Sequence, residues 1–237
     1  MGEAMAWALL AASSLLVGAL VAFAVPIPRR VLGLIMGFGA GVLISAVAYE
    51  LILEAVEVSA DRFAVAAGFA AGALVFYAGD VAIDRRTAGS GDAGGLALVL
   101  GAVLDGIPES VVIGISLLAG EGASVAVIVA VFLSNVPEAI SATSDLLSGG
   151  WSKGKVLAMW GLVVLASGLA AGLGFVVLEG ASGSLVAAIQ AFAAGSILTM
   201  LADAMIPEAF EFTGHNKTVG LTLALGFAVS AALSFTT

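Results

Sequence analysis

The chain contains no cysteine and a single histidine, His215, among its 237 residues. The absence of cysteine excludes disulfide bonds, thiolate metal ligands and thiol catalysis. Charge is also scarce, because 11% of the residues are charged, compared with about a quarter in an ordinary globular domain. Since 61% of the residues are hydrophobic, a soluble fold would have too little polar surface. The composition therefore predicts a membrane protein.

The apolar residues form blocks that match the roughly 20 helical residues needed to cross a hydrocarbon core about 30 Å thick. Breaks at charged or Gly/Pro-rich points leave no room for a separate soluble domain, so we predict one polytopic all-α membrane domain over residues 1–237. No Lys or Arg precedes the first apolar block, so we expect a transmembrane helix there and not a cleaved signal peptide. The eight predicted helices are 5–25, 31–56, 62–83, 95–119, 123–147, 155–178, 184–210 and 217–236.

The basic residues predict the orientation of these helices, because cytoplasmic loops are enriched in Lys and Arg. One set of alternate loops carries Arg29, Arg30, Arg85, Arg86, Lys153, Lys155 and Lys217, and the other set carries only Arg62. This alternation predicts that the N- and C-termini lie outside the cytoplasm. We accordingly expect a multi-pass protein of the cell membrane, with the lipid bilayer as its partner.

A repeat links the second and seventh predicted helices. The segment 38–57 aligns without gaps on 192–211, and eight of 20 positions match, Glu54 with Glu208 among them. These two helices cross in opposite directions, so the repeat is inverted, with helices 1–3 related to helices 6–8 around a central pair. Inverted repeats with Pro-interrupted helices are typical of transporters. The alternative is that Gly- and Ala-rich helices look alike through composition alone.

The central pair carries acids inside apolar helices. Asp105 and Glu109 are four residues apart and share a helix face, as do Ser134 and Glu138. An ionised acid at the centre of a membrane helix costs about 2.5 to 3.5 kcal/mol, so several together require a stabilising partner. A divalent cation with oxygen ligands is such a partner. We predict a metal site formed by Asp105, Glu109, Ser134, Asn135 and Glu138.

Two prolines lie beside these acids. Pro108 and Pro137 each disrupt a helical hydrogen bond, which would free the carbonyls of Leu104 and Leu133 as further ligands where they line a cavity. The alternative is a simple helix kink.

Further acids outline a route to this site. We predict an entry or exit path formed by Glu50, Glu54, Asp203 and Glu208. The alternative for acids near helix ends, including Glu54, is that they only reach interfacial water. Asp80, Asp84 and Asp145 are expected beside loops, and we assign them no role.

The Pro-Glu pairs at Glu109 and Glu138, the acid-bearing second helix and the Pro-Glu pair at Glu208 resemble the ZIP (Zrt/Irt-like) metal-transporter family over nearly the whole chain. The resemblance implies eight helices, both ends outside, and a site on helices four and five. It also implies that Glu109 and Glu138 bridge metal ions. Asp105 and Ser134 fall where that family usually has His or another polar ligand.

The sequence departs from that family in lacking both signature histidines and a His-rich third loop. Asn135 falls where the family often has Asn or Asp, and Glu208 where its seventh helix carries an acid. Since oxygen ligands suit harder ions, the expected cargo is Zn²⁺ or an ion such as Mn²⁺ or Fe²⁺, moved toward the cytoplasm. His215 is expected to be a solvated loop residue.

Three alternatives to metal transport remain. The chain could carry another substrate on the same scaffold, it could be a transport-inactive relative, or it could be an intramembrane enzyme. The enzyme is disfavoured because no His-based motif is present and the acids come as Pro-Glu pairs. We therefore expect no catalytic residues and no cofactor, metal ions being cargo. We also expect no nucleic-acid partner, and small-residue faces compatible with a homodimer.

Overall fold

The computed structural model describes residues 1–87, 93–117 and 125–235, which form helices and no strand. The predicted all-helical class is confirmed, and the helices fall close to the predicted ranges. The described helices, grouped into eight rods, are α1 (Gly2–Ala24), α2 (Arg29–Ala46) with η1 (Val47–Leu53) and α3 (Glu54–Val58), α4 (Arg62–Thr87), α5 (Ala93–Ser116), α6 (Val125–Ser148), α7 (Lys153–Leu178), α8 (Gly183–Met200) with η3 (Leu201–Met205) and α9 (Ile206–Phe212), and α10 (Thr218–Ser234). Among the described residues, six rods are long and apolar enough to cross a membrane, and α10 is a shorter apolar helix.

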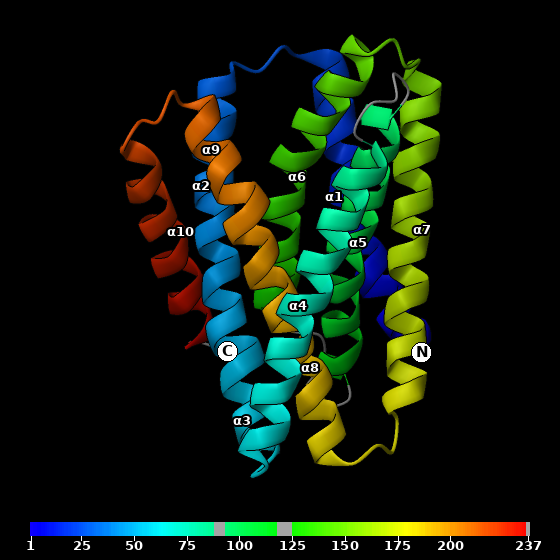
Figure 1. Cartoon of the computed structure of the whole chain (residues 1–237), viewed down its shortest axis with the longest axis vertical. Coiled ribbons are helices and arrows are strands. Elements are labelled where there is room, and N and C mark those ends of the chain that lie inside the picture. The colour runs from blue at the N-terminus through cyan, green and yellow to red at the C-terminus, as the bar shows by residue number, and fades with distance from the viewer. Residues whose placement is uncertain (88–92, 118–124, 236–237) are drawn as a thin grey trace.

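The rods run up and down alternately in one bundle (Figure 1). We call the end where α2, α7 and α10 begin the upper end, as it is drawn in Figure 1, and the opposite end the lower end. Arg29, Lys153 and Lys217 lie at the upper end, whereas Arg62 begins α4 at the lower end.

Two pairs of rods pack through glycines that allow very close backbone approach. In each pair, a Cβ atom added to the glycine would collide with a carbonyl oxygen of the partner helix, as small residues at membrane helix interfaces permit. Between α2 and α10, these glycines are Gly41, which lies against the carbonyl of Leu223, and Gly226, which lies against that of Phe38. Between α4 and α8, they are Gly195, against the carbonyl of Phe69, and Gly72, against that of Phe192.

The second and seventh rods share an irregularity that the sequence did not predict. In each, 18 residues of α-helix lead directly into a π-helical segment, η1 in one rod and η3 in the other. Single π-helical turns are rare and occur frequently at functional sites. By contrast, helices α5 and α6 continue through Pro108 and Pro137.

The remaining rods surround α5 and α6. Helix α6 packs against α1 and α2, while α5 packs against α7 and α8. The fully buried Trp160 of α7 donates a hydrogen bond from Nε1 to Thr143 Oγ1 of α6, at 2.9 Å. This packing holds the polar faces of α5 and α6 inside the bundle.

Candidate cation site

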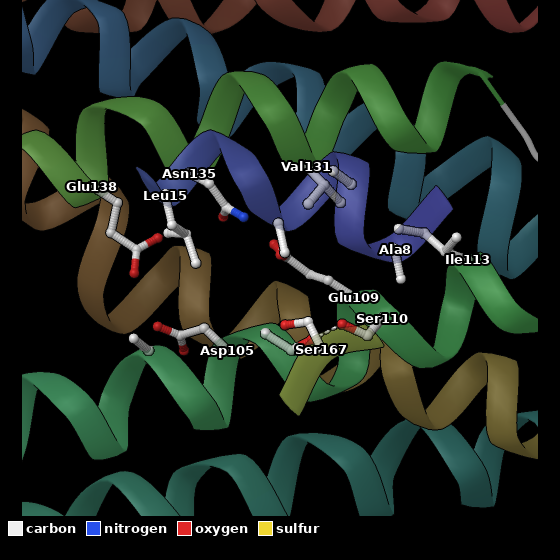
Figure 2. Close-up of a pocket in the computed structure, with 14 residues that line it drawn as sticks. Ala8, Leu15, Asp105, Glu109, Ser110, Ile113, Val131, Asn135, Glu138 and Ser167 are labelled. Carbon is white, nitrogen blue, oxygen red and sulfur yellow. Dashed lines mark hydrogen bonds between the residues drawn. The ribbon is translucent and has the colours of Figure 1, made fainter. Parts of the chain in front are cut away.

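A narrow cavity lies between α5 and α6, with walls completed by α1 and α7 (Figure 2). Asp105 and Glu109 reach it from α5, and Asn135 and Glu138 reach it from α6. Figure 2 shows the Asp105 and Glu138 side chains pointing into the same space from opposite helices. The cavity volume is about 10 Å³, which is close to the minimum for one water molecule. The structure thus brings four of the five predicted ligands to one small space.

The carboxylates of this cavity are held close to one another. Glu109 is 3% exposed, and its carboxylate accepts a hydrogen bond from the Asn135 side chain. Asp105 lies close enough to Glu109 and Glu138 to be repelled by both. None of the described residues lining the cavity is basic. No described residue of the lining could therefore pair with these carboxyl groups as a counter-ion, and their oxygens could instead ligate a cation.

Ser134 is the predicted ligand that the structure does not bring to the cavity. It is 1% exposed, and its hydroxyl donates to the carbonyl of Val131 in the same helix, at 3.0 Å. The Ser134 backbone and the Leu133 carbonyl lie against Gly39 of α2, where an added Cβ would be 3.3 Å and 3.1 Å away. Neither residue lines the cavity, and neither does Leu104.

Two serines that the sequence analysis did not select also line the cavity. Ser110 follows Glu109 on α5, and Ser167 comes from α7; both are 4% exposed. Ser110 donates to the carbonyl of Gly106, at 2.5 Å. In the sequence, Ser167 is an isolated serine within a long apolar helix. This isolation is the only sequence feature that could have indicated a role for it.

A larger chamber adjoins the narrow cavity on the side of the upper end. It measures about 250 Å³ and shares Asp105 and Glu138 with the narrow cavity. Its other carboxylates are those of Asp80, Asp145 and Glu208. Asp145 is exposed, so the chamber extends to the surface of the bundle. We call it the acidic chamber.

Asp80 and Asp145, to which the sequence analysis assigned no role, both line the acidic chamber. Helix α4 was predicted to end near residue 83, but it extends to Thr87, so Asp80 lies about two turns inside the helix. There it approaches Asp105 closely enough to act on its charge. Asp84 lies on the same helix, outside the residues whose side chains are described.

The structure does not bring the four predicted path residues together. Glu208 lines the acidic chamber and accepts a hydrogen bond from Ser141 of α6, at 2.7 Å. Glu54 lies in a different cavity at the lower end. Glu50 and Asp203 occupy the π-helical segments and are not among the residues lining these cavities.

Two further observations bear on the predicted metal. Over residues 1–87, 93–117 and 125–235, no group of three or more Asp, Glu or His side chains is placed so that it could hold one metal ion. His215 is exposed in a turn at the upper end, with a positive φ of 59°, and does not line the cavity. The carboxylates therefore share a space without forming a complete coordination shell.

Comparison with known proteins adds no identification. A scan of the sequence against protein-family models and a search of the curated proteins give no match.

Proposed function

We propose that this chain moves a divalent metal cation across a membrane through the narrow cavity between α5 and α6. The observation that carries the proposal is that this cavity is very small and is lined by three carboxyl groups. The cavity has a volume of about 10 Å³ and is lined by Asp105, Glu109 and Glu138 without a described basic residue. A sugar, peptide or nucleotide would not fit such a space, whereas a dehydrated ion would.

The ligand chemistry of the cavity favours a hard or borderline divalent ion. Carboxylate, amide and hydroxyl oxygens suit Mg²⁺, Mn²⁺ and related ions, and the absence of imidazole and thiolate reduces the preference for Zn²⁺. Asp105 and Glu109 are one helical turn apart, and Glu138 faces them from α6. A cation would remove their mutual repulsion and draw them together through side-chain rotation. This rearrangement accounts for a shared cavity that has no complete metal shell.

The wider architecture supports a transporter. The alignment that pairs residues 38–57 with 192–211 also relates the two pairs of helix contacts. Continued along the chain at the same spacing, it makes the contact of Gly41 with Leu223 equivalent to that of Gly195 with Phe69. In the same way, the contact of Gly226 with Phe38 is equivalent to that of Gly72 with Phe192. The π-helical segments begin at matching positions, Val47 and Leu201. We therefore include in the proposal an inverted repeat of helices 1–3 and 6–8 around α5 and α6.

The proposed orientation follows from charge. We place the upper end, with Arg29, Lys153 and Lys217, in the cytoplasm of a cell and both termini outside. The acidic chamber then leads from the narrow cavity toward the cytoplasm. On the other side of the cavity, Ile113 and Val131 join a buried apolar core, which separates the site from the lower end. Transport requires alternation between this arrangement and one that opens toward the lower end.

The test is uptake of Zn²⁺, Mn²⁺, Fe²⁺, Mg²⁺ and Cd²⁺ into proteoliposomes that contain the wild type, Glu138→Ala or Glu211→Ala. Glu211 is an exposed carboxylate of α9 outside the cavities, so its variant is the matched control. The proposal predicts selective uptake that Glu138→Ala abolishes and Glu211→Ala preserves. Absence of uptake for every ion, or equal uptake by both variants, contradicts it and favours a different substrate or an inactive relative.

A further inference from the structure

Helix α7 contributes one described residue, Ser167, to the lining of the narrow cavity. From Gly161 to the end of the helix at Leu178, every other residue is apolar or glycine. The Ser167 side chain is 4% exposed, and Figure 2 shows it pointing into the space between α5 and α6. An otherwise apolar stretch of helix therefore presents a single polar atom to the carboxylates of the cavity.

The Ser167 hydroxyl has no hydrogen-bond partner among the described residues. Serines in membrane helices commonly donate to a carbonyl three or four residues earlier, and Ser14, Ser110 and Ser134 do so in this protein. Ser167 has two such carbonyls on its own helix and donates to neither. Because a buried polar group without a partner is destabilising, the free hydroxyl indicates a ligand in the cavity.

The hydroxyl lies beside the turn of α5 that carries two of the carboxylates. Gly106 is part of this turn, and a Cβ atom added to it would lie 3.3 Å from Ser167 Oγ. The lack of a side chain at Gly106 thus leaves room for the hydroxyl against α5. Asp105 precedes Gly106 directly, and Glu109 follows three residues later, so the hydroxyl oxygen and both carboxylates face one space (Figure 2).

The hydrogen bonding of this hydroxyl favours a role as an acceptor. Elsewhere the protein holds buried acids with donors, as Asn135 does for Glu109 and Ser141 does for Glu208. Ser167 donates to no carboxylate of the described residues, so the lone pairs of its oxygen are available. Carboxylate and neutral oxygens that face one space are ligands for a hard divalent cation. A water molecule that satisfies the hydroxyl is the alternative, and it predicts a different outcome below.

We propose that Ser167 is a ligand of the transported cation and that its hydroxyl oxygen sets the preference of the site for hard ions. The inference rests on the proposed function for the narrow cavity as the cation site. Ser167 adds a neutral oxygen from a third helix to Asp105, Glu109, Asn135 and Glu138 of α5 and α6. Since hard ions prefer oxygen and softer ions prefer sulfur, exchange of this one atom changes which ion binds best.

A cysteine at position 167 tests the contact directly. The chain has no cysteine, so Ser167→Cys introduces its only thiol. Ser13→Cys is the matched control, because Ser13 occupies the equivalent position of α1 in the proposed repeat, donates to the carbonyl of Leu10 and does not line the cavity. Each purified protein is titrated with Cd²⁺, and the ultraviolet charge-transfer absorption of a cadmium–thiolate bond is measured.

The expected result is an absorption band that saturates at one Cd²⁺ per chain in Ser167→Cys and is absent from Ser13→Cys and the wild type. A band in both cysteine variants, or in neither, overturns the proposal. Size-exclusion chromatography confirms that each variant is folded.

Equilibrium dialysis against Mn²⁺ and separately against Cd²⁺ tests the preference. Ser167→Ala should weaken Mn²⁺ binding about tenfold, and Ser134→Ala, which changes a serine outside the cavity, should leave it unchanged. Ser167→Cys should weaken Mn²⁺ binding and strengthen Cd²⁺ binding, so that the ratio of the two affinities changes about 100-fold. A wild type that binds no Mn²⁺, a Ser167→Ala protein with unchanged Mn²⁺ affinity, or a parallel loss for both ions in Ser167→Cys overturns the proposal.

Uptake into proteoliposomes separates this proposal from the proposed function. Ser167→Ala should raise the Mn²⁺ concentration for half-maximal uptake about tenfold. Uptake that Glu138→Ala abolishes and Ser167→Ala leaves unchanged overturns the role of Ser167 while transport stands. Conversely, the cadmium–thiolate band of Ser167→Cys without uptake of any ion by the wild type overturns transport and leaves Ser167 as a cation ligand.

Discussion

At the upper end of the bundle, Glu208 of α9 is held by a hydroxyl of α6, and at the lower end, Glu54 of α3 is held by the amide of Gln190. In the proposed repeat, these glutamates are equivalent, and the position equivalent to Gln190 is Met36, which lines the acidic chamber. The same scaffold thus presents different chemistry at its two ends. The acidic chamber gathers carboxylates, whereas a separate cavity at the lower end is lined by Glu54, Glu179 and Gln190 among mostly apolar residues.

This difference indicates how a symmetric architecture can carry out a directional process. In the proposed transporter, the equivalent helices would provide two exits from one central site, and the side chains that line each exit would set how strongly a cation is held there. A chamber with Asp80, Asp145 and Glu208 suits removal of the ion from the narrow cavity, because several weak sites in series favour movement.

The largest expected effect comes from breaking one helix pair of the repeat. Gly72→Ala and Gly226→Ala would each force a Cβ to about 2 Å from a partner carbonyl, and each should lower the free energy of unfolding by at least about 3 kcal/mol, the upper end of typical overpacking costs. Gly161→Ala is the control, since an added Cβ there meets nothing within 4 Å. Thermal unfolding in detergent measures all three. A large loss for one pair only would show that the two halves are not equivalent.

The next largest effect is expected on cation binding, from a comparison of Asn135, which lines the narrow cavity, with its neighbour Ser134, which does not. Asn135→Ala removes the amide that holds Glu109 and should weaken cation binding about 10- to 100-fold, as loss of supporting groups around metal ligands does. Ser134→Ala changes the adjacent residue, which does not line the cavity, and should leave uptake within about twofold. Concentration-dependent uptake compares them. The reverse order of effects would return Ser134 to the ligand set.

A smaller effect is expected at the acidic chamber. Ser141→Ala removes the hydroxyl that donates to Glu208 and should raise the cation concentration for half-maximal uptake about fivefold, which corresponds to about 1 kcal/mol. Ser144→Ala is the matched control, because within the described residues that hydroxyl donates to the carbonyl of Ile140 in its own helix. Equal behaviour of the two variants would remove Glu208 from the cation path.

The smallest effect is expected at the mouth of the same chamber. Arg29 and Asp145 form an ion pair at 3.7 Å, with side chains 69% and 55% exposed. Exposed pairs contribute about 0 to 1 kcal/mol, so Arg29→Gln should change the free energy of unfolding by less than about 1 kcal/mol and should leave the maximal uptake rate intact. Thermal unfolding and uptake assays check both. A variant with abolished uptake would show that this pair controls access to the chamber.

Much of the fold could be predicted because long apolar blocks and charged breaks mark membrane helices directly. Four of the five predicted ligands meet in one cavity because i, i+4 spacing places side chains on one face. Ser134 shares a face with Glu138 but misses the cavity, and its backbone lies against Gly39 of α2, a contact that the spacing alone does not reveal. Asp80 was missed because helix ends are poorly marked in sequence.

The irregular features could not be predicted in the same way. The π-helical segments at η1 and η3 have no simple sequence signature, since an extra residue in a turn depends on the helices packed around it. Gln190 is the only glutamine in the sequence, but one neutral polar residue in an apolar helix does not specify a partner. Its role became visible only when the fold placed it beside Glu50 and Glu54.

The central claim is that one divalent cation binds to the carboxylates of the narrow cavity. The most direct test is equilibrium dialysis of the purified wild-type protein against Zn²⁺ and separately against Mn²⁺, with bound metal counted by elemental analysis. The account predicts one tightly bound ion per chain for at least one of these metals, and its loss when Glu138→Ala is added. A wild-type protein that binds neither ion, or a Glu138→Ala protein that keeps its ion, would contradict the account.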